Sequence, residues 1–258
     1  MSYYTGNDVY RRLDAAGDPG FVWVSGNAWI LIYGDAYAHA KVVAFVRARS
    51  IGNENTGALQ RTRHGWALAK ELAQRVGLPF FDICYEDQAE EIDSVELNGH
   101  LLSLEKLKND FESAGLQVKN GTVGKAINSR ESSAYHHWQR QSLGSITVSD
   151  IDLFRLDDHR STPIEIIELK RSYFQIQDWK PYPQDFPNFN LIVDVARRAD
   201  IQFTIAYNYH VKRPAYIDDA SSMSLFEYPS PAGNARHSGI FTFDQFVAGD
   251  YLQGKGQR

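Results

Sequence analysis

Four charged residues in the second half of the chain have types and spacing that suit metal-assisted hydrolysis. Asp150 and Asp152 interrupt one apolar stretch, and Glu168 and Lys170 stand at the polar end of the next. Because residues two apart in a strand share a face, we expect Asp150 to point with Asp152, and Glu168 with Lys170. If the two strands pair, carboxylates of one lie beside a carboxylate and an ammonium group of the other.

These groups together predict the hydrolysis of phosphodiester bonds. Carboxylates with open coordination positions suit Mg²⁺, a hard ion that prefers oxygen ligands and keeps several waters, and Mn²⁺ is expected to substitute for it. Such an ion polarises a phosphate oxygen and lowers the pKa of a bound water. A lysine nearby orients that water and stabilises the charge that develops on the phosphate.

The tripeptide Glu168-Leu169-Lys170 is weak evidence by itself, since composition alone predicts about one acidic-x-Lys triplet in this chain. A second triplet, Asp178-Trp179-Lys180, lies among prolines and follows no aspartate-bearing strand. The strand context therefore favours Glu168 and Lys170, because charges within apolar strands are costly to bury unless they are paired or bound to metal. The alternative is an ordinary Glu–Lys surface pair at a sheet edge.

The elements that must position these residues follow from apolar periodicity and from turn residues. In the second half we expect helices at 101–114, 124–141 and 188–198, strands at 146–156, 164–170 and 202–209, and a loop with one short strand at 214–235. In the first half we expect a helix at 3–17, strands at 21–25, 28–33, 42–46 and 80–85, a helix at 57–76, and a surface crossing at 86–99.

Residues 120–210 resemble the PD-(D/E)XK nuclease superfamily, whose core runs helix–strand–strand–strand–helix–strand. Glu168-Leu169-Lys170 stands for the family's acidic-x-Lys motif, and Ser149-Asp150 or Ile151-Asp152 for its Pro-Asp, without the proline. One core strand is not separately visible. The resemblance implies an α/β fold with a mixed sheet and a restriction endonuclease-like core.

The same resemblance implies a role for each residue. Asp152 and Glu168 are expected to hold Mg²⁺, with Asp150 as an auxiliary ligand, and Lys170 to position the attacking water. Many members of the family add an acid from the first core helix, and Glu131 is the acidic residue available in 124–141. A solvated glutamate on a helix face is the alternative for Glu131.

The first half of the chain resembles the second at an offset of about 122–123 residues. In that overlay Ile30, Val46 and Ala48 fall where Asp152, Glu168 and Lys170 stand. One interpretation is a duplication whose first copy lacks the catalytic residues, and the other is shared generic patterning. We accordingly expect an N-terminal α/β domain at 1–100, for recognition, dimerisation or scaffolding, and a nuclease domain at 101–258.

Composition limits the function without deciding it. The chain has 258 residues, a net charge of −5 and 43% hydrophobic residues, which is ordinary for a globular protein. The acidic balance counts against a purely charge-driven nucleic-acid binder. The single cysteine, Cys84, and the absence of a signal pattern or of an apolar run of about 20 residues predict a cytoplasmic protein without membrane spans.

The sequence thus predicts a nuclease whose partner is nucleic acid, with DNA preferred to RNA, and it leaves a homodimer open. An RNA-directed nuclease of the same fold is one alternative. The other is a non-catalytic nucleic-acid-binding or assembly protein with a vestigial nuclease fold.

Overall fold

The computed structural model describes residues 6–17, 20–24, 26–50, 56–88, 90–118, 133–144, 146–229 and 234–252. The first half contains α1 (Asp8–Ala16), β1 (Phe21–Val22), β2 (Ala28–Gly34), β3 (Ala40–Ala48), α2 (Thr56–Val76), β4 (Phe80–Tyr85), β5 (Ser94–Leu97), β6 (His100–Ser103) and α3 (Leu104–Ser113). The second half contains α4 (Ala134–Ser142), β7 (Thr147–Asp150), β8 (Leu153–Leu156), β9 (Pro163–Ser172), η2 (Pro183–Asp185), α5 (Phe186–Arg198), β10 (Gln202–Val211), β11 (Ile217–Glu227), β12 (Arg236–Thr242), α6 (Phe243–Ala248) and η3 (Asp250–Leu252).

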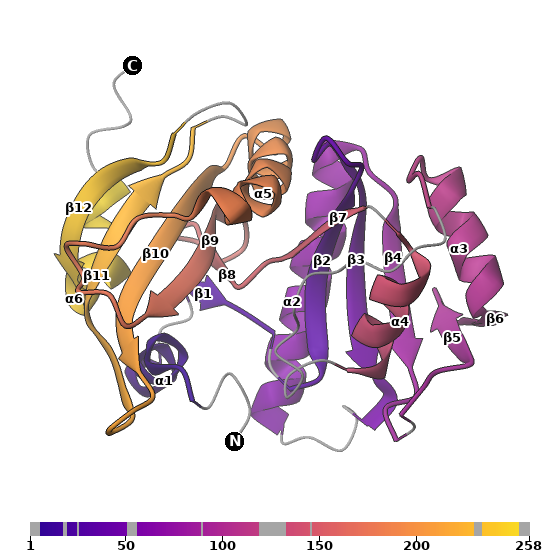
Figure 1. Cartoon of the computed structure of the whole chain (residues 1–258), viewed down its shortest axis with the longest axis horizontal. Coiled ribbons are helices and arrows are strands. Elements are labelled where there is room, and N and C mark those ends of the chain that lie inside the picture. Colours follow the sequence, from indigo (N-terminus) through magenta and orange to yellow (C-terminus); the bar gives the residue numbers. More distant parts are fainter. Residues whose placement is uncertain are drawn as a thin grey trace.

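The strands form two six-stranded mixed sheets in an α/β fold (Figure 1). Sheet A has the order β1-β8-β9-β10-β11-β12, and sheet B the order β6-β5-β4-β3-β2-β7. Helices α2 and α5 pack between the sheets in one apolar core, while α1 with α6 cover the outer face of sheet A and α3 with α4 that of sheet B. The packing is close: a Cβ added to Gly34 of β2 would lie 2.4 Å from Leu191 Cδ1 of α5.

The two sheets repeat one pattern of connections. In sheet B, β2 and β3 are antiparallel, β3 and β4 are parallel around α2, and β5 and β6 follow as antiparallel neighbours. In sheet A, β8 to β12 pair in the same senses around α5. Each series then runs directly into a short helix, α3 or α6, whose N-cap is Ser103 or Thr242. This is the topology expected of an internal repeat.

The C-terminal ends of α2 and α5 have the same backbone conformation and the same hydrogen bond. Gly77 and Asp200 both have a left-handed φ, of 66° and 54°. The N–H of the next residue donates back into the helix in each case, from Leu78 to Ala73 O at 2.9 Å and from Ile201 to Ala196 O at 3.0 Å. This Schellman-type ending satisfies carbonyl groups that a helix terminus leaves without partners.

The repeats exchange their first helix and first strand. Strand β1 pairs with β8 of sheet A, and β7 pairs with β2 of sheet B. The helices follow their strands: the Tyr10 hydroxyl of α1 donates to Asp152 O at 3.1 Å, and Tyr135 of α4 shares a 2.9 Å hydroxyl contact with Tyr33 of β2. Each sheet therefore draws on both halves of the chain, and no single cut at residue 100 separates the two sheets.

In β3, the directions of the side chains shift the expected alignment of the first half of the chain on the second by one residue. Val43 and Phe45 face α2, whereas Val46 and Ala48 face the outer helices of sheet B. In β9, Ile166 packs in the inner core and the Lys170 ammonium lies 5.5 Å from the centre of the Phe189 ring of α5. The counterparts of Glu168 and Lys170 are thus Phe45 and Arg47, instead of Val46 and Ala48, because a slip of one residue reverses every side chain of a strand.

Several expected elements have other limits in the structure. The expected strand 146–156 is two strands in different sheets: Ile151 N–H bonds to Ile30 O beside sheet B, and the chain then crosses to sheet A at Asp152. The structure therefore has two strands, one in each sheet, where the sequence predicted one. The expected crossing at 86–99 contains β5, the expected helix 101–114 begins with β6, and the expected loop at 214–235 contains the eleven residues of β11.

The sequence predicted only the end of β11, as a strand at 225–228, because residues 217–222 are mostly polar and partly exposed. Ala220, Met223 and Leu225 enter the core, and Ser224 and Phe226 are buried as well. Of the expected helix 124–141, the structure shows α4 from Ala134, and residues 119–132 lie outside the described residues. In the described part of the chain, no helix combines the length and the apolar character of a membrane span.

Candidate active site

The structure brings Asp152, Glu168 and Lys170 together on the face of sheet A that α5 covers. Leu153 pairs with Ile167, so Asp152 comes beside Glu168 at the start of β8. The Leu169 N–H donates to Asp152 Oδ2 at 2.8 Å, which fixes one oxygen of this carboxylate. The Lys170 ammonium lies 2.7 Å from Glu168 Oε1. Two carboxylates and an ammonium group therefore lie close together, as the strand pairing predicts.

The second oxygen of Glu168 distinguishes this carboxylate from an ordinary buried ion pair. Glu168 is 5% exposed, and its Oε2 atom has no hydrogen-bond partner among the described residues. A buried charged oxygen without a partner costs free energy, and native structures rarely keep one without reason. A cation or a water held by that cation would satisfy Oε2.

The electrostatics of the site also favour a bound cation. Burial, followed by the charges of Glu168 and Asp150, holds the pKa of Asp152 well above its usual value, although the Leu169 N–H opposes the shift. Burial also raises the pKa of Glu168, against the lowering effect of Lys170. Burial alone would lower the pKa of Lys170, but Glu168 outweighs it and raises that pKa. Two carboxylates that repel each other in a buried site are an arrangement that a cation stabilises.

The other expected site residues are placed differently. Asp150 is exposed at the end of β7, opposite Leu31 in sheet B, so it does not share a strand with Asp152. Its charge nevertheless raises the pKa of both Asp152 and Glu168. Glu131 lies outside the described residues.

Sequence reasoning missed Asp185, the residue before α5. Its carboxylate makes no capping hydrogen bond to the helix, and its charge raises the pKa of both Glu168 and Lys170. Asp185 stands one turn before Phe189, whose ring lies under the Lys170 ammonium. An acidic residue at the start of the helix that packs over the Glu-x-Lys strand was the available signal.

The residues present fit a magnesium ion held by few protein ligands. Among the residues the structure describes, no group of three or more His, Cys, Asp or Glu side chains is placed to hold a metal. Asp152 and Glu168 offer two carboxylates and one unpartnered oxygen, and Mg²⁺ commonly binds through one or two carboxylates with waters and substrate phosphates completing its shell. Asp152 and Glu168 are therefore the residues that would hold the ion.

The corresponding place in sheet B has different chemistry. Ile30 and Phe45, both 1% exposed, stand where Asp152 and Glu168 stand in sheet A. Arg47 stands where Lys170 does, and its Nε lies 3.4 Å from Asp82 Oδ1. The carboxylate pair is thus replaced by an apolar pair, so among the described residues only sheet A carries the candidate centre.

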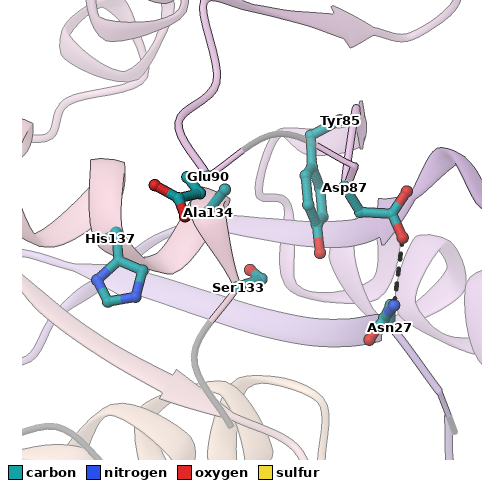
Figure 2. Close-up of a pocket in the computed structure, with 7 residues that line it drawn as sticks. All are labelled: Asn27, Tyr85, Asp87, Glu90, Ser133, Ala134 and His137. Atoms are coloured by element: carbon teal, nitrogen blue, oxygen red, sulfur yellow. Dashed lines mark hydrogen bonds between the residues drawn. The ribbon is translucent and has the colours of Figure 1, made fainter. Parts of the chain in front are cut away.

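A separate pocket of about 490 Å³ lies over sheet B (Figure 2). Its lining residues are Asn27, Tyr85, Asp87, Glu90, Ser133, Ala134 and His137. The Asp87 carboxylate already accepts hydrogen bonds from Ser50 and from Asn27 at 3.3 Å. The pocket contains no residue of the carboxylate site. We place the candidate centre at the carboxylates, because the unpartnered Glu168 oxygen and the neighbouring lysine specify a chemistry that the pocket does not.

Comparison of the chain with protein-family models, with curated proteins and with solved structures gave no match.

Proposed function

We propose that the protein is a magnesium-dependent nuclease that hydrolyses phosphodiester bonds, in DNA in preference to RNA. The observation that carries the proposal is the buried Glu168 carboxylate, with one oxygen on Lys170 and the other without a partner, beside Asp152. An ordinary structural ion pair does not need the second carboxylate or the unpartnered oxygen.

Each side chain has a separate task in this proposal. Asp152 and Glu168 hold Mg²⁺, which supplies Lewis acidity at a phosphate oxygen and activates water for attack. The Lys170 ammonium orients the attacking water and stabilises the negative charge that develops on the phosphate. The Leu169 N–H fixes Asp152, and the Phe189 ring supports Lys170, so both groups are positioned before substrate arrives. Asp150 adds negative charge at the edge of the site and thereby raises the pKa of both carboxyl groups.

The chain order around the site supports the same proposal. In sheet A the elements α1, β1, β8, β9, α5 and β10 take the order helix–strand–strand–strand–helix–strand of the superfamily that the sequence resembles, with α1 and β1 supplied by the first half of the chain. Strand β7, which the sequence did not separate from β8, pairs with β2 in sheet B. Asp152 precedes β8, and Glu168 and Lys170 lie on β9, which are the places that the resemblance assigns to the two motifs.

The test is cleavage of supercoiled, linear and branched DNA with Mg²⁺ by the wild-type chain and by Lys170→Met. We expect the variant to lose about 10²- to 10³-fold in rate, the usual cost of removing one group that stabilises developing charge. Arg47→Met is the matched control, because it removes the cation from the corresponding position of sheet B. Undiminished cleavage by Lys170→Met contradicts the proposal, and an equal loss in Arg47→Met shows that the effect is not specific to the site.

Sheet B favours one alternative, a nucleic-acid-binding protein without catalysis. The same scaffold there keeps its fold with Ile30 and Phe45 in place of the carboxylates. This alternative predicts nucleic-acid binding that is indifferent to divalent metal and to Glu168→Gln, and no cleavage of any substrate. Competition between DNA and RNA oligomers of the same sequence separates the RNA-directed nuclease from the proposed enzyme.

A further inference from the structure

An exposed pair of aromatic rings follows directly after the strand that carries Glu168 and Lys170. Tyr173 is 69% exposed and Phe174 is 38% exposed. Their ring centroids are 4.6 Å apart with an interplanar angle of 23°, so the two rings stack at the surface. Large aromatic side chains usually bury their area, and an exposed stacked pair keeps apolar surface available to a partner.

The pair stands on a rigid support. The Tyr207 hydroxyl of β10 bonds to the carbonyl oxygens of Ser172, at 2.8 Å, and Phe174, at 2.5 Å. The Tyr207 ring stacks on Trp179, with centroids 4.4 Å apart and an interplanar angle of 1°. Trp179 is 3% exposed, so it is part of the core. The segment that carries the two exposed rings is therefore held against the core through Tyr207. Such a support keeps the entropy cost of binding low.

The position of the pair links it to the carboxylate site. Strands β9 and β10 are parallel, and Ser172, the last residue of β9, pairs with Tyr209 of β10. Both strands therefore end at the same edge of sheet A. Tyr173 lies three residues beyond Lys170, which is about 10 Å along an extended chain. A polymer whose phosphate lies at Lys170 reaches the aromatic pair without leaving this edge.

Basic side chains lie at the same edge. Lys212 and Arg213 follow β10 directly and are exposed, and Lys180 is exposed just beyond the buried Trp179. In the described part of the chain, none of these three cations takes part in an ion pair. Exposed aromatic rings beside unpaired cations are the combination by which proteins hold single-stranded nucleic acid, through base stacking and phosphate contacts.

The geometry points to a binding site for unpaired bases of single-stranded DNA on Tyr173 and Phe174, with Lys212 and Arg213 on the phosphates. This inference rests on the proposed function and names its substrate class, a strand with unpaired bases next to the cleaved bond. A base stacks on the exposed Tyr173 ring, and the adjoining backbone runs along β9 towards Lys170. A fully paired duplex offers no free base face to this ring.

The test is binding of a fluorescent DNA oligomer of about 16 nucleotides, the upper range for one small binding fold, in buffer with EDTA so that no cleavage occurs. The wild-type chain is compared with Tyr173→Ala, Tyr173→Phe and Tyr37→Ala. Tyr37 is the matched control, because it is 82% exposed and belongs to the β2–β3 connection of sheet B. A 2-aminopurine base in the oligomer reports stacking by loss of its fluorescence.

We expect Tyr173→Ala to bind about 5- to 150-fold more weakly, the range that corresponds to the loss of one stacked base. Tyr173→Phe and Tyr37→Ala should bind as the wild type does, and a blunt duplex should bind more weakly than the single strand. Replacing Lys212 and Arg213 by alanine should reduce the slope of log K against log salt by about 1.4. Quenching of 2-aminopurine should disappear only in Tyr173→Ala.

Three results overturn the inference: unchanged binding by Tyr173→Ala, equal binding of duplex, or quenching that persists without the Tyr173 ring. A change in oligomeric state of Tyr173→Ala with unchanged DNA binding would assign the rings to a contact between copies of this chain instead. These outcomes are separate from the proposed function. If the protein cleaves DNA and Tyr173→Ala binds DNA normally, the nuclease proposal stands and the binding site is wrong. If DNA binding depends on Tyr173 but no DNA is cleaved, the binding site stands and the nuclease proposal is wrong.

Discussion

Glu165 and Glu168 lie three residues apart on β9 and face opposite sides of sheet A. The Glu165 carboxylate is fully buried and accepts hydrogen bonds from Arg155 at 3.0 Å, from Tyr251 at 2.6 Å and from Thr204. Glu168 is almost as buried, yet only its Oε1 atom has a partner, Lys170. One strand thus contains a buried glutamate whose partners are complete and a buried glutamate whose partners are incomplete. The second belongs to the candidate centre.

Magnesium should stabilise the folded protein through this centre. An ion that binds only the folded state raises the free energy of unfolding by about 1.4 kcal/mol at ten times its dissociation constant, which raises the melting temperature by a few degrees. Asp152→Asn and Glu168→Gln should lose most of this increase, and Arg47→Met should keep it. Thermal unfolding with and without Mg²⁺ measures the effect. An increase of equal size in all four proteins would place the ion elsewhere.

A single candidate centre within the described part of the chain predicts that a duplex is cut one strand at a time. The place in sheet B that corresponds to the carboxylates holds Ile30 and Phe45 and has no second centre to cut the other strand. Supercoiled plasmid should therefore accumulate as open circles before linear product appears, as gel electrophoresis over time shows. Linear product that forms at the earliest times without open circles would mean that two chains act together.

Removing the carboxylate of Glu165 should destabilise the fold severely. Glu165→Ala leaves the buried Arg155 guanidinium without its counter-charge, and breaking a buried ion pair by removing one partner costs about 3–5 kcal/mol. Glu105→Ala is the control, because the Glu105 side chain is 74% exposed in its pair with Lys108. Its removal should cost about 1 kcal/mol or less. Urea unfolding followed by circular dichroism measures both, and equal losses would contradict this role of Glu165.

His136 should make the protein less stable in mild acid. Burial lowers its pKa to about 4, although the Asp150 charge opposes this shift and Arg140 and His137 add to it. Above about pH 6.5 the imidazole is neutral in both states and has no effect. Between about pH 6.5 and pH 4 the unfolded chain binds a proton that the folded chain does not, so the free energy of unfolding falls by up to about 1.4 kcal/mol per pH unit.

The variant His136→Gln should remove that part of the pH dependence. The ring of His136 meets the Trp29 ring edge-on, with centroids 4.6 Å apart, so the comparison is made between slopes and not between absolute stabilities. Equal slopes for wild type and His136→Gln between pH 6.5 and pH 4 would show that His136 titrates normally in the folded chain.

The sequence by itself determined most helices and strands and the chemistry of one strand. Apolar periodicity and turn residues placed β2, β3, α2, β4, β9, α5 and β10 within a few residues, because these elements bury regular apolar faces. The type and spacing of Glu168 and Lys170 likewise follow from the local pattern of β9. The similarity between the two halves was also visible, since both use the same strand–helix–strand pattern.

Only the tertiary structure decided which residues meet. The stretch Thr147 to Leu156 is apolar enough for either sheet, and its division into β7 and β8 depends on pairing with Leu31 on one side and Ile167 on the other. That division separates Asp150 from Asp152. The exchange of α1–β1 and α4–β7 between the repeats, and the missing partner of Glu168 Oε2, are also invisible locally. Each depends on contacts between residues that are far apart in the chain, and periodicity within one segment does not specify them.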